Sequence, residues 1–73
     1  MTTITPARLY LAAIVAETAW TNALNATFGT RALISRYQPE GQGAPGSELR
    51  MAYDAKRRAD DAYLAALRAP AEA

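Results

Sequence analysis

The chain has 73 residues, contains no cysteine and no histidine, and carries a formal net charge of +1. A chain of this length forms at most one small domain, and the missing residue types exclude disulfides, thiolate sites and the usual zinc and general-base chemistry. So small a net charge gives no field that would attract nucleic acid or an anionic membrane. We therefore expect a single domain over residues 1–73 with no cofactor and no metal, in a reducing cytoplasm.

A domain of this size buries a small fraction of its surface and usually needs a disulfide, a metal or a partner chain. Since the composition excludes disulfides and disfavours a metal site, association with other copies is the remaining means of stabilisation. A homodimer is the expected state.

The first predicted element is a helix over residues 6–37. Thr5 is placed to cap it and Pro6 suits its first position, and apolar residues then recur at helical spacing through Ala26. Its apolar run, residues 9–16, is shorter than the roughly 20 residues of a membrane span. The run mimics the core of a signal peptide, but the proline and the continuing helical pattern favour a helix of the folded chain.

Gly29 interrupts this pattern, and it either kinks the helix or ends it, with Thr30 capping a short continuation through Tyr37. Residues 38–47 hold three glycines and two prolines, which predicts the one clear loop.

The second predicted helix covers residues 48–69. Ser47 is a suitable cap, Glu48 is favourable in the first turn, and Pro70 stops the helix.

Small residues, almost all alanine, fill most positions of a heptad pattern in both predicted helices, and such side chains let two helix backbones approach closely. The positions are Leu9, Ala12, Ala16, Ala19, Ala23, Ala26, Thr30 and Leu33 in the first helix and Ala52, Ala55, Ala59, Ala62, Ala66 and Ala69 in the second. A short loop makes the helices antiparallel neighbours, so we expect Leu33 near Ala52, Ala26 near Ala59 and Ala19 near Ala66. The predicted fold class is all-α, an antiparallel two-helix hairpin with an alanine-rich seam that dimerises into a four-helix arrangement.

Alanine side chains bury little area, so the larger residues beside the seam must contribute to stability. One flank of the hairpin is aromatic and aliphatic, and we expect it to bind a partner protein, with charged residues at its rim. The predicted partner-binding residues are Trp20, Leu24, Phe28, Arg31, Tyr53, Lys56, Asp60 and Tyr63. A second patch on the first helix, formed by Leu11, Ile14 and Val15, is the predicted dimer interface, because a two-helix hairpin cannot cover a helix on every side.

The charged stretch "YDAKRRADDAYLAAL", residues 53–67, is predicted to be a solvated helix face. Arg50 and Asp54, Asp54 and Arg58, and Arg57 and Asp61 are four residues apart, a spacing that suits intrahelical ion pairs. Nucleic-acid binding needs a stripe of uncompensated cations, and carboxylate catalysis needs two acids that converge in a pocket. Neither pattern is present, so nucleic acid is an unlikely partner and we expect no enzyme activity.

The layout resembles small accessory proteins of temperate bacteriophages that bind and inhibit host proteins, such as anti-CRISPR and anti-quorum-sensing proteins. The likeness is carried by the stretch "APGSELRMAYDAKRRADDAYLAALRA", residues 44–69, and by the helix of residues 6–28. The resemblance implies a homodimer in the host cytoplasm that occupies a surface of a host regulator, motor or defence protein.

The sequence thus favours a non-enzymatic protein–protein interaction module that acts as an inhibitor. Two alternatives stay open. One is a structural unit whose apolar flank is consumed by self-association. The other is a nucleotide-sequestering protein that stacks bases on its tyrosines with the help of arginines.

Overall fold

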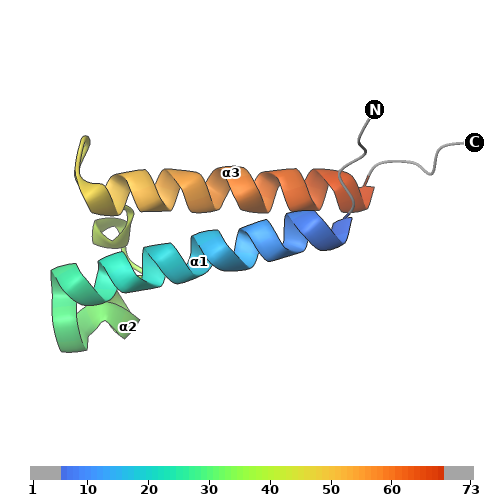
Figure 1. Ribbon diagram of the computed structural model, residues 1–73. Coiled ribbons are helices and arrows are strands. Elements are labelled where there is room, and N and C mark those ends of the chain that lie inside the picture. Colours follow the sequence, from blue (N-terminus) through green and yellow to red (C-terminus); the bar gives the residue numbers. More distant parts are fainter. Residues whose placement is uncertain (1–5, 69–73) are drawn as a thin grey trace, which may run out of the picture.

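The computed structural model describes residues 6–68, which form two long helices and a connecting segment made of short helical turns (Figure 1). The α-helices are α1 (Pro6–Phe28), α2 (Ala32–Ser35) and α3 (Glu48–Arg68), and the 3₁₀ helices are η1 (Gly29–Arg31) and η2 (Pro39–Gln42). This part of the chain contains no strand. The predicted all-α helical hairpin is therefore confirmed for these residues.

The two long helices lie side by side, and their contacts run in reverse chain order (Figure 1). The Tyr10 ring lies 5.3 Å from the Tyr63 ring, and the Trp20 ring lies 5.7 Å from the Tyr53 ring. The start of α1 and the end of α3 thus share one end of the hairpin, which we call the open end. The opposite end, where the connecting segment of residues 29–47 lies, is the tip.

Gly29 ends the first helix rather than kinking it. Its φ of +59° is in the left-handed region, where glycine has no Cβ penalty and where α-helices commonly terminate. The helical continuation is limited to η1 and to the single turn of α2. The predicted Thr30 cap is wrong, because the residue at the N-cap of α2 is Arg31 and no side chain caps that turn.

The early end of α1 also overturns the predicted register between the helices. We expected Ala19 near Ala66, but its neighbour Trp20 packs against Tyr53. The contact on α3 is therefore shifted by several helical turns towards the start of that helix. The prediction assumed that the chain reverses after residue 37. Because Gly29 ends α1 about two turns earlier, α3 pairs with an earlier part of α1.

The predicted alanine seam is only partly correct. In α3 most of its alanines face α1 and are half-buried, but Ala62 is exposed, as are Ala12, Ala19 and Ala26 in α1. The face of α1 that is buried instead carries Ala13, Trp20 and Leu24. Large apolar side chains gain more from burial than methyl groups do, so α1 is rotated to place Trp20 and Leu24 inside.

α3 begins as predicted. The Ser47 hydroxyl accepts a hydrogen bond of 3.0 Å from the backbone N–H of Arg50, which is the geometry of an N-cap. The predicted positions at Thr5, Ala69 and Pro70 lie outside the described residues.

The connecting segment folds back over the hairpin and forms part of its core. Trp20, Leu24, Ala32 and Leu49 make the buried apolar cluster, and Phe28, Ala23, Ala52 and Tyr53 pack against it. Three residues of the segment, Ala32, Ser35 and Gly41, are themselves buried. The connecting segment is therefore a packed layer over the tip half of the hairpin, and Gly41 of the predicted loop belongs to it.

Candidate functional site

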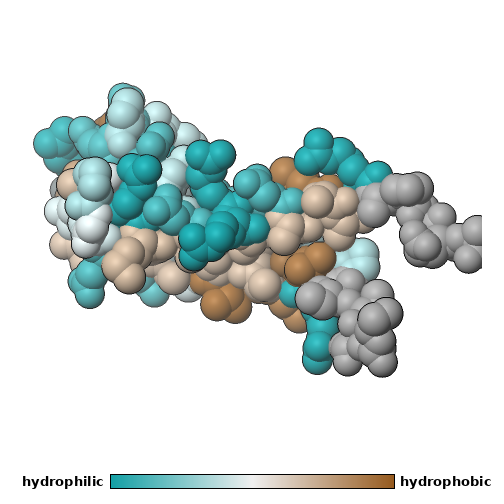
Figure 2. Space-filling view, turned by 90° about the horizontal axis from the view of Figure 1, so that it is seen from above, coloured by the Kyte–Doolittle hydropathy of each residue, from teal (hydrophilic) through white to brown (hydrophobic). Residues whose placement is uncertain are grey.

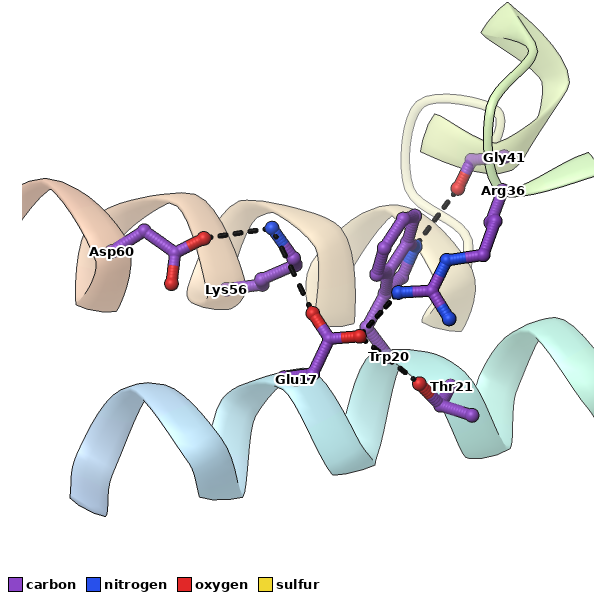
Figure 3. A network of polar contacts seen from close by, with 7 residues as sticks. All are labelled: Glu17, Trp20, Thr21, Arg36, Gly41, Lys56 and Asp60. Atoms are coloured by element: carbon purple, nitrogen blue, oxygen red, sulfur yellow. Dashed lines mark hydrogen bonds and ion pairs between the residues drawn. The ribbon is translucent and has the colours of Figure 1, made fainter. Parts of the chain in front are cut away.

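Trp20 is the centre of the side-chain contacts between the connecting segment and the two long helices (Figure 3). Its indole Nε1 donates a 2.9 Å hydrogen bond to the carbonyl oxygen of Gly41. The guanidinium carbon of Arg36 lies 4.9 Å from the ring centroid and the ammonium nitrogen of Lys56 lies 5.2 Å from it. Both distances suit cation–π attraction. Only 5% of Trp20 is exposed, so this residue holds the fold together.

Glu17 links the same two cations from the α1 side (Figure 3). One of its carboxylate oxygens accepts hydrogen bonds from Arg36 and from the Thr21 hydroxyl. Its other oxygen lies 3.8 Å from Lys56 Nζ, which also donates a 2.7 Å bond to Asp60. The cluster joins α1, α3 and the connecting segment. It is charge-balanced, with two carboxylates and two cations, so it presents no net charge to a ligand.

Replacing Glu17 with glutamine keeps the shape of the side chain and removes its charge. We expect the free energy of unfolding to fall by about 0.5–1 kcal/mol at low salt, because the network is partly exposed and water screens it. The loss should shrink as the salt concentration rises. Urea denaturation followed by circular dichroism measures both effects.

The matched control is Asp61→Asn, which removes the same charge from an exposed carboxylate that makes no ion pair in residues 6–68. Equal losses for the two variants, or a Glu17→Gln loss that does not depend on salt, would show that the cluster contributes no specific stability.

The charged face of α3 is mostly solvated, as predicted, and one of its three predicted ion pairs forms. Arg50 and Asp54 lie 3.2 Å apart, as expected. The expected partners of Arg57 and Arg58 do not bind them, and neither arginine makes an ion pair within the part of the chain that is described. The i, i+4 spacing alone does not select which partner a flexible exposed side chain takes.

A shallow groove runs along the open half of the hairpin, on the side where α1 and α3 meet. Its volume is about 320 Å³, and its walls are formed by Tyr10, Ala13, Ile14, Glu17, Thr18, Asp60 and Tyr63. Leu64 and Leu67 follow Asp60 and Tyr63 by four residues on α3, so they continue this wall towards the open end. Both leucines are exposed. The groove is thus apolar and aromatic, with carboxylates only at the end nearest the connecting segment.

The tip exposes a second apolar cluster, formed by Leu33, Ile34 and Tyr37 and here called the tip cluster. Tyr37 is 81% exposed, and the other two are also largely exposed. The backbone beneath them is fixed, because Ala32 and Ser35 are buried and the Ser35 hydroxyl donates a 2.6 Å bond to Glu40. A second hollow of about 340 Å³ lies beside the tip between Phe28 and Leu49.

The structure separates the residues that the sequence grouped into one partner-binding flank. Trp20 and Leu24 are buried, Phe28, Tyr53, Tyr63, Lys56 and Asp60 are half-buried, and Arg31 is exposed. Trp20 was predicted to contact a partner, but the connecting segment and Lys56 cover its ring. The predicted dimer residues Leu11, Ile14 and Val15 are exposed, as expected.

Neither Glu17 nor the tip cluster was predicted as part of a site, and the contacts of Arg36 with Trp20 and Glu17 were not predicted. A signal for Glu17 is present, since it and Arg8 are the only charged residues of α1, and an isolated charge in an uncharged helix indicates a specific partner. No sequence pattern indicated the tip cluster, because the predicted helix through residue 37 placed Leu33 in the seam.

Comparison with known proteins adds no family to this description. No protein-family model matches the chain, and no curated protein or solved structure matches it significantly. Within residues 6–68, no group of three or more acidic residues is arranged to hold a metal ion. None of the helices in the described region is both long and apolar enough to cross a lipid bilayer.

Proposed function

We propose that this chain is a non-enzymatic protein–protein interaction module, an antiparallel helical hairpin that forms a homodimer and inhibits a host protein by occupying its surface. The observation that carries the proposal is the apolar surface that one hairpin leaves uncovered. Figure 2 shows apolar side chains gathered towards the open end. The exposed large apolar residues there are Tyr10, Leu11, Ile14, Val15, Leu64 and Leu67.

The charge distribution supports a protein partner for α1. Only two of the 23 residues of α1 are charged, whereas α3 carries nine charged residues among 21. The central parts of protein interfaces are depleted in charge, whereas solvated helix faces are rich in it. Val15, which is 69% exposed, lies on the uncharged outer side of α1. This surface favours the predicted dimer interface at Leu11, Ile14 and Val15.

The host-binding surface that we propose is the part of the tip formed by Phe28, which lines the second hollow, and by the exposed Arg31; the tip cluster is not part of it. Trp20 and Leu24 support this region from inside and do not contact the partner. Tyr53 and Lys56 pack on Trp20, so they also act as supports. The resemblance to phage accessory proteins is the reason to expect a host regulator, motor or defence protein as the target.

A purely structural oligomerisation unit is the second candidate, and the uncharged outer face of α1 favours it equally. A nucleotide-sequestering role is less well supported. The aromatic rings and arginine that would stack on a base already contact one another, as in Tyr10 with Tyr63 and Arg36 with Trp20.

Capture of partners from bacterial lysate with a tagged chain, analysed by mass spectrometry, tests the proposal. We expect one host protein to bind in stoichiometric amount. Arg31→Glu should weaken its capture at least about tenfold, since a charge reversal at an interface opposes the partner's complementary charge.

The matched control for this capture is Arg58→Glu, the same reversal at an exposed arginine of α3 that makes no ion pair in the described region. It should bind the target as the wild type does. If the tagged chain captured only its own copies, the structural unit would replace the inhibitor.

A further inference from the structure

On one side of the hairpin, the junction between α1 and α3 is covered in the tip half and bare in the open half. In the tip half, the connecting segment lies over α1 and α3 and buries Trp20 and Leu24, the latter to 1% exposure. In the open half, the same junction between the helices is bare and forms the groove with Tyr10 and Tyr63 at its walls. Glu17 marks the boundary, because it lines the groove and also binds Arg36 of the connecting segment.

Each protomer is therefore thick at the tip and thin at the open end on one side. A two-fold rotation about an axis across the middle of the hairpin places the thick half of one copy over the thin half of the other. Packing groove against groove would leave two concave surfaces facing each other, and protein interfaces are packed as densely as protein interiors. A convex apolar feature fills a groove better, and the tip cluster is such a feature.

We infer that the groove of one protomer receives the tip cluster of a second copy, so that Leu33, Ile34 and Tyr37 pack on Ile14 and the neighbouring aromatic walls, twice per dimer. This inference rests on the homodimer proposed above and names its interface. It uses the predicted dimer residue Ile14 and adds the tip, which the sequence did not indicate.

The exposed area is sufficient for such a dimer. Taking about 200 Å² for a fully exposed large apolar residue, the groove residues Tyr10, Ile14, Leu64 and Leu67 expose roughly 400 Å² per protomer and the tip cluster roughly 400 Å². Burying most of both in a reciprocal contact removes roughly 1,300 Å² from water, at the lower end of the roughly 1,200–2,000 Å² of a standard specific interface.

The surface of α1 between the groove and the tip also suits an interface. The exposed residues of α1 from Thr18 onward are Thr18, Ala19, Asn22, Asn25, Ala26 and Thr27, and none of them is charged. Apart from Glu17, which is already paired with Arg36 and Lys56, no ionised group of α1 lies between the groove and the tip to be desolvated at a cost of several kcal/mol. Amide and hydroxyl groups there can form hydrogen bonds across the two-fold axis.

Complementation between two variants tests the inference. Ile34→Asp places a charge in the tip cluster, where Ile34 is 64% exposed, and Ile14→Asp places one in the groove. Each homodimer then has two damaged contacts and should dissociate with a Kd at least about tenfold higher than the wild type. A mixture should form heterodimers, because the intact tip of one variant meets the intact groove of the other.

The measurement is native mass spectrometry of the mixture, with one variant isotopically labelled, beside sedimentation equilibrium of each protein alone. Leu64→Asp serves as a second groove variant if Ile14→Asp loses its helical circular dichroism. The control is Met51→Asp, on an exposed α3 residue outside the groove and the tip cluster. It should dimerise as the wild type does.

Two results would overturn the inference, and they differ in whether the proposed homodimer survives. If Ile34→Asp dimerises as tightly as the wild type, the tip is not part of the interface, and the proposed homodimer stands with another contact. If the wild type sediments as a monomer of 7.8 kDa at high concentration, the homodimer of the proposed function fails as well.

Discussion

Trp20→Ala is expected to abolish the native fold at 25 °C. The residue is almost fully buried and joins three parts of the chain, through Gly41, Tyr53 and the two cations on its ring. Truncating a buried tryptophan costs about 3–5 kcal/mol, and the core of a domain of this size rarely contributes more than about that amount. Circular dichroism at 222 nm should show that most of the helix is lost.

Trp20→Phe tests the contribution of the Trp20 hydrogen bond apart from that of the aromatic ring. It keeps an aromatic ring in the core and leaves the Gly41 carbonyl without its donor, so we expect a folded protein destabilised by about 1–3 kcal/mol. All variants should be compared at one protein concentration, because association raises apparent stability. A Trp20→Ala protein with wild-type helix content and melting temperature would mean that the connecting segment does not depend on this residue.

Gly41→Ala is expected to have the second largest effect. A Cβ atom at this position would lie 2.4 Å from the backbone oxygen of Ser35 and 3.1 Å from the Cα of Arg36, and neither atom can move without shifting the connecting segment. The shift would also weaken the bond from Trp20 to the Gly41 carbonyl. We expect a loss of about 2–4 kcal/mol from overpacking and the weakened hydrogen bond, measured by urea denaturation.

Gly46→Ala is the matched control for this clash. Gly46 has a positive φ of 85°, but no atom lies within 4 Å of the place that an alanine Cβ would take. Alanine there costs only the strain of the left-handed conformation, about 1 kcal/mol. If the two variants lost equal stability, close packing at Gly41 would not be the reason that this position requires glycine.

The helices themselves were predictable because their signals are local. Pro6 and Ser47 mark the starts of the two long helices through capping preferences, and the spacing of the apolar residues marks the helical stretches. α3 begins at Glu48 as expected. Gly29 is a visible weak point in the sequence, but its context could not show whether the helix bends or ends there. That choice depends on whether the following residues find a packed position, which is a tertiary property.

The face of α1 that packs inward was mispredicted for a related reason. The alanine heptad and the stripe with Trp20 and Leu24 lie about one residue apart on the same helix, and both have a periodicity that fits a packed face. Which of these two stripes faces inward depends on what covers the large side chains. Because Arg36 and Gly41 reach Trp20 from the connecting segment, the larger stripe is buried and Ala12, Ala19 and Ala26 are left exposed.

The sequence indicated part of the candidate interaction surface. Leu11, Ile14 and Val15 stand out because apolar residues surround the first turns of α1, and they are exposed. The groove depends on the register between α1 and α3, which brings Tyr10 to Tyr63. The predicted register was shifted, so the sequence alone could not bring these two tyrosines together.

The most direct test of the dimer is a nuclear Overhauser measurement on a sample in which only one of the two copies is isotopically labelled. We expect contacts between the copies from the Ile34 methyl groups and the Tyr37 ring of one to the Ile14 methyl groups and the Tyr63 ring of the other. A dimer whose intermolecular contacts all lie elsewhere would contradict the proposed interface.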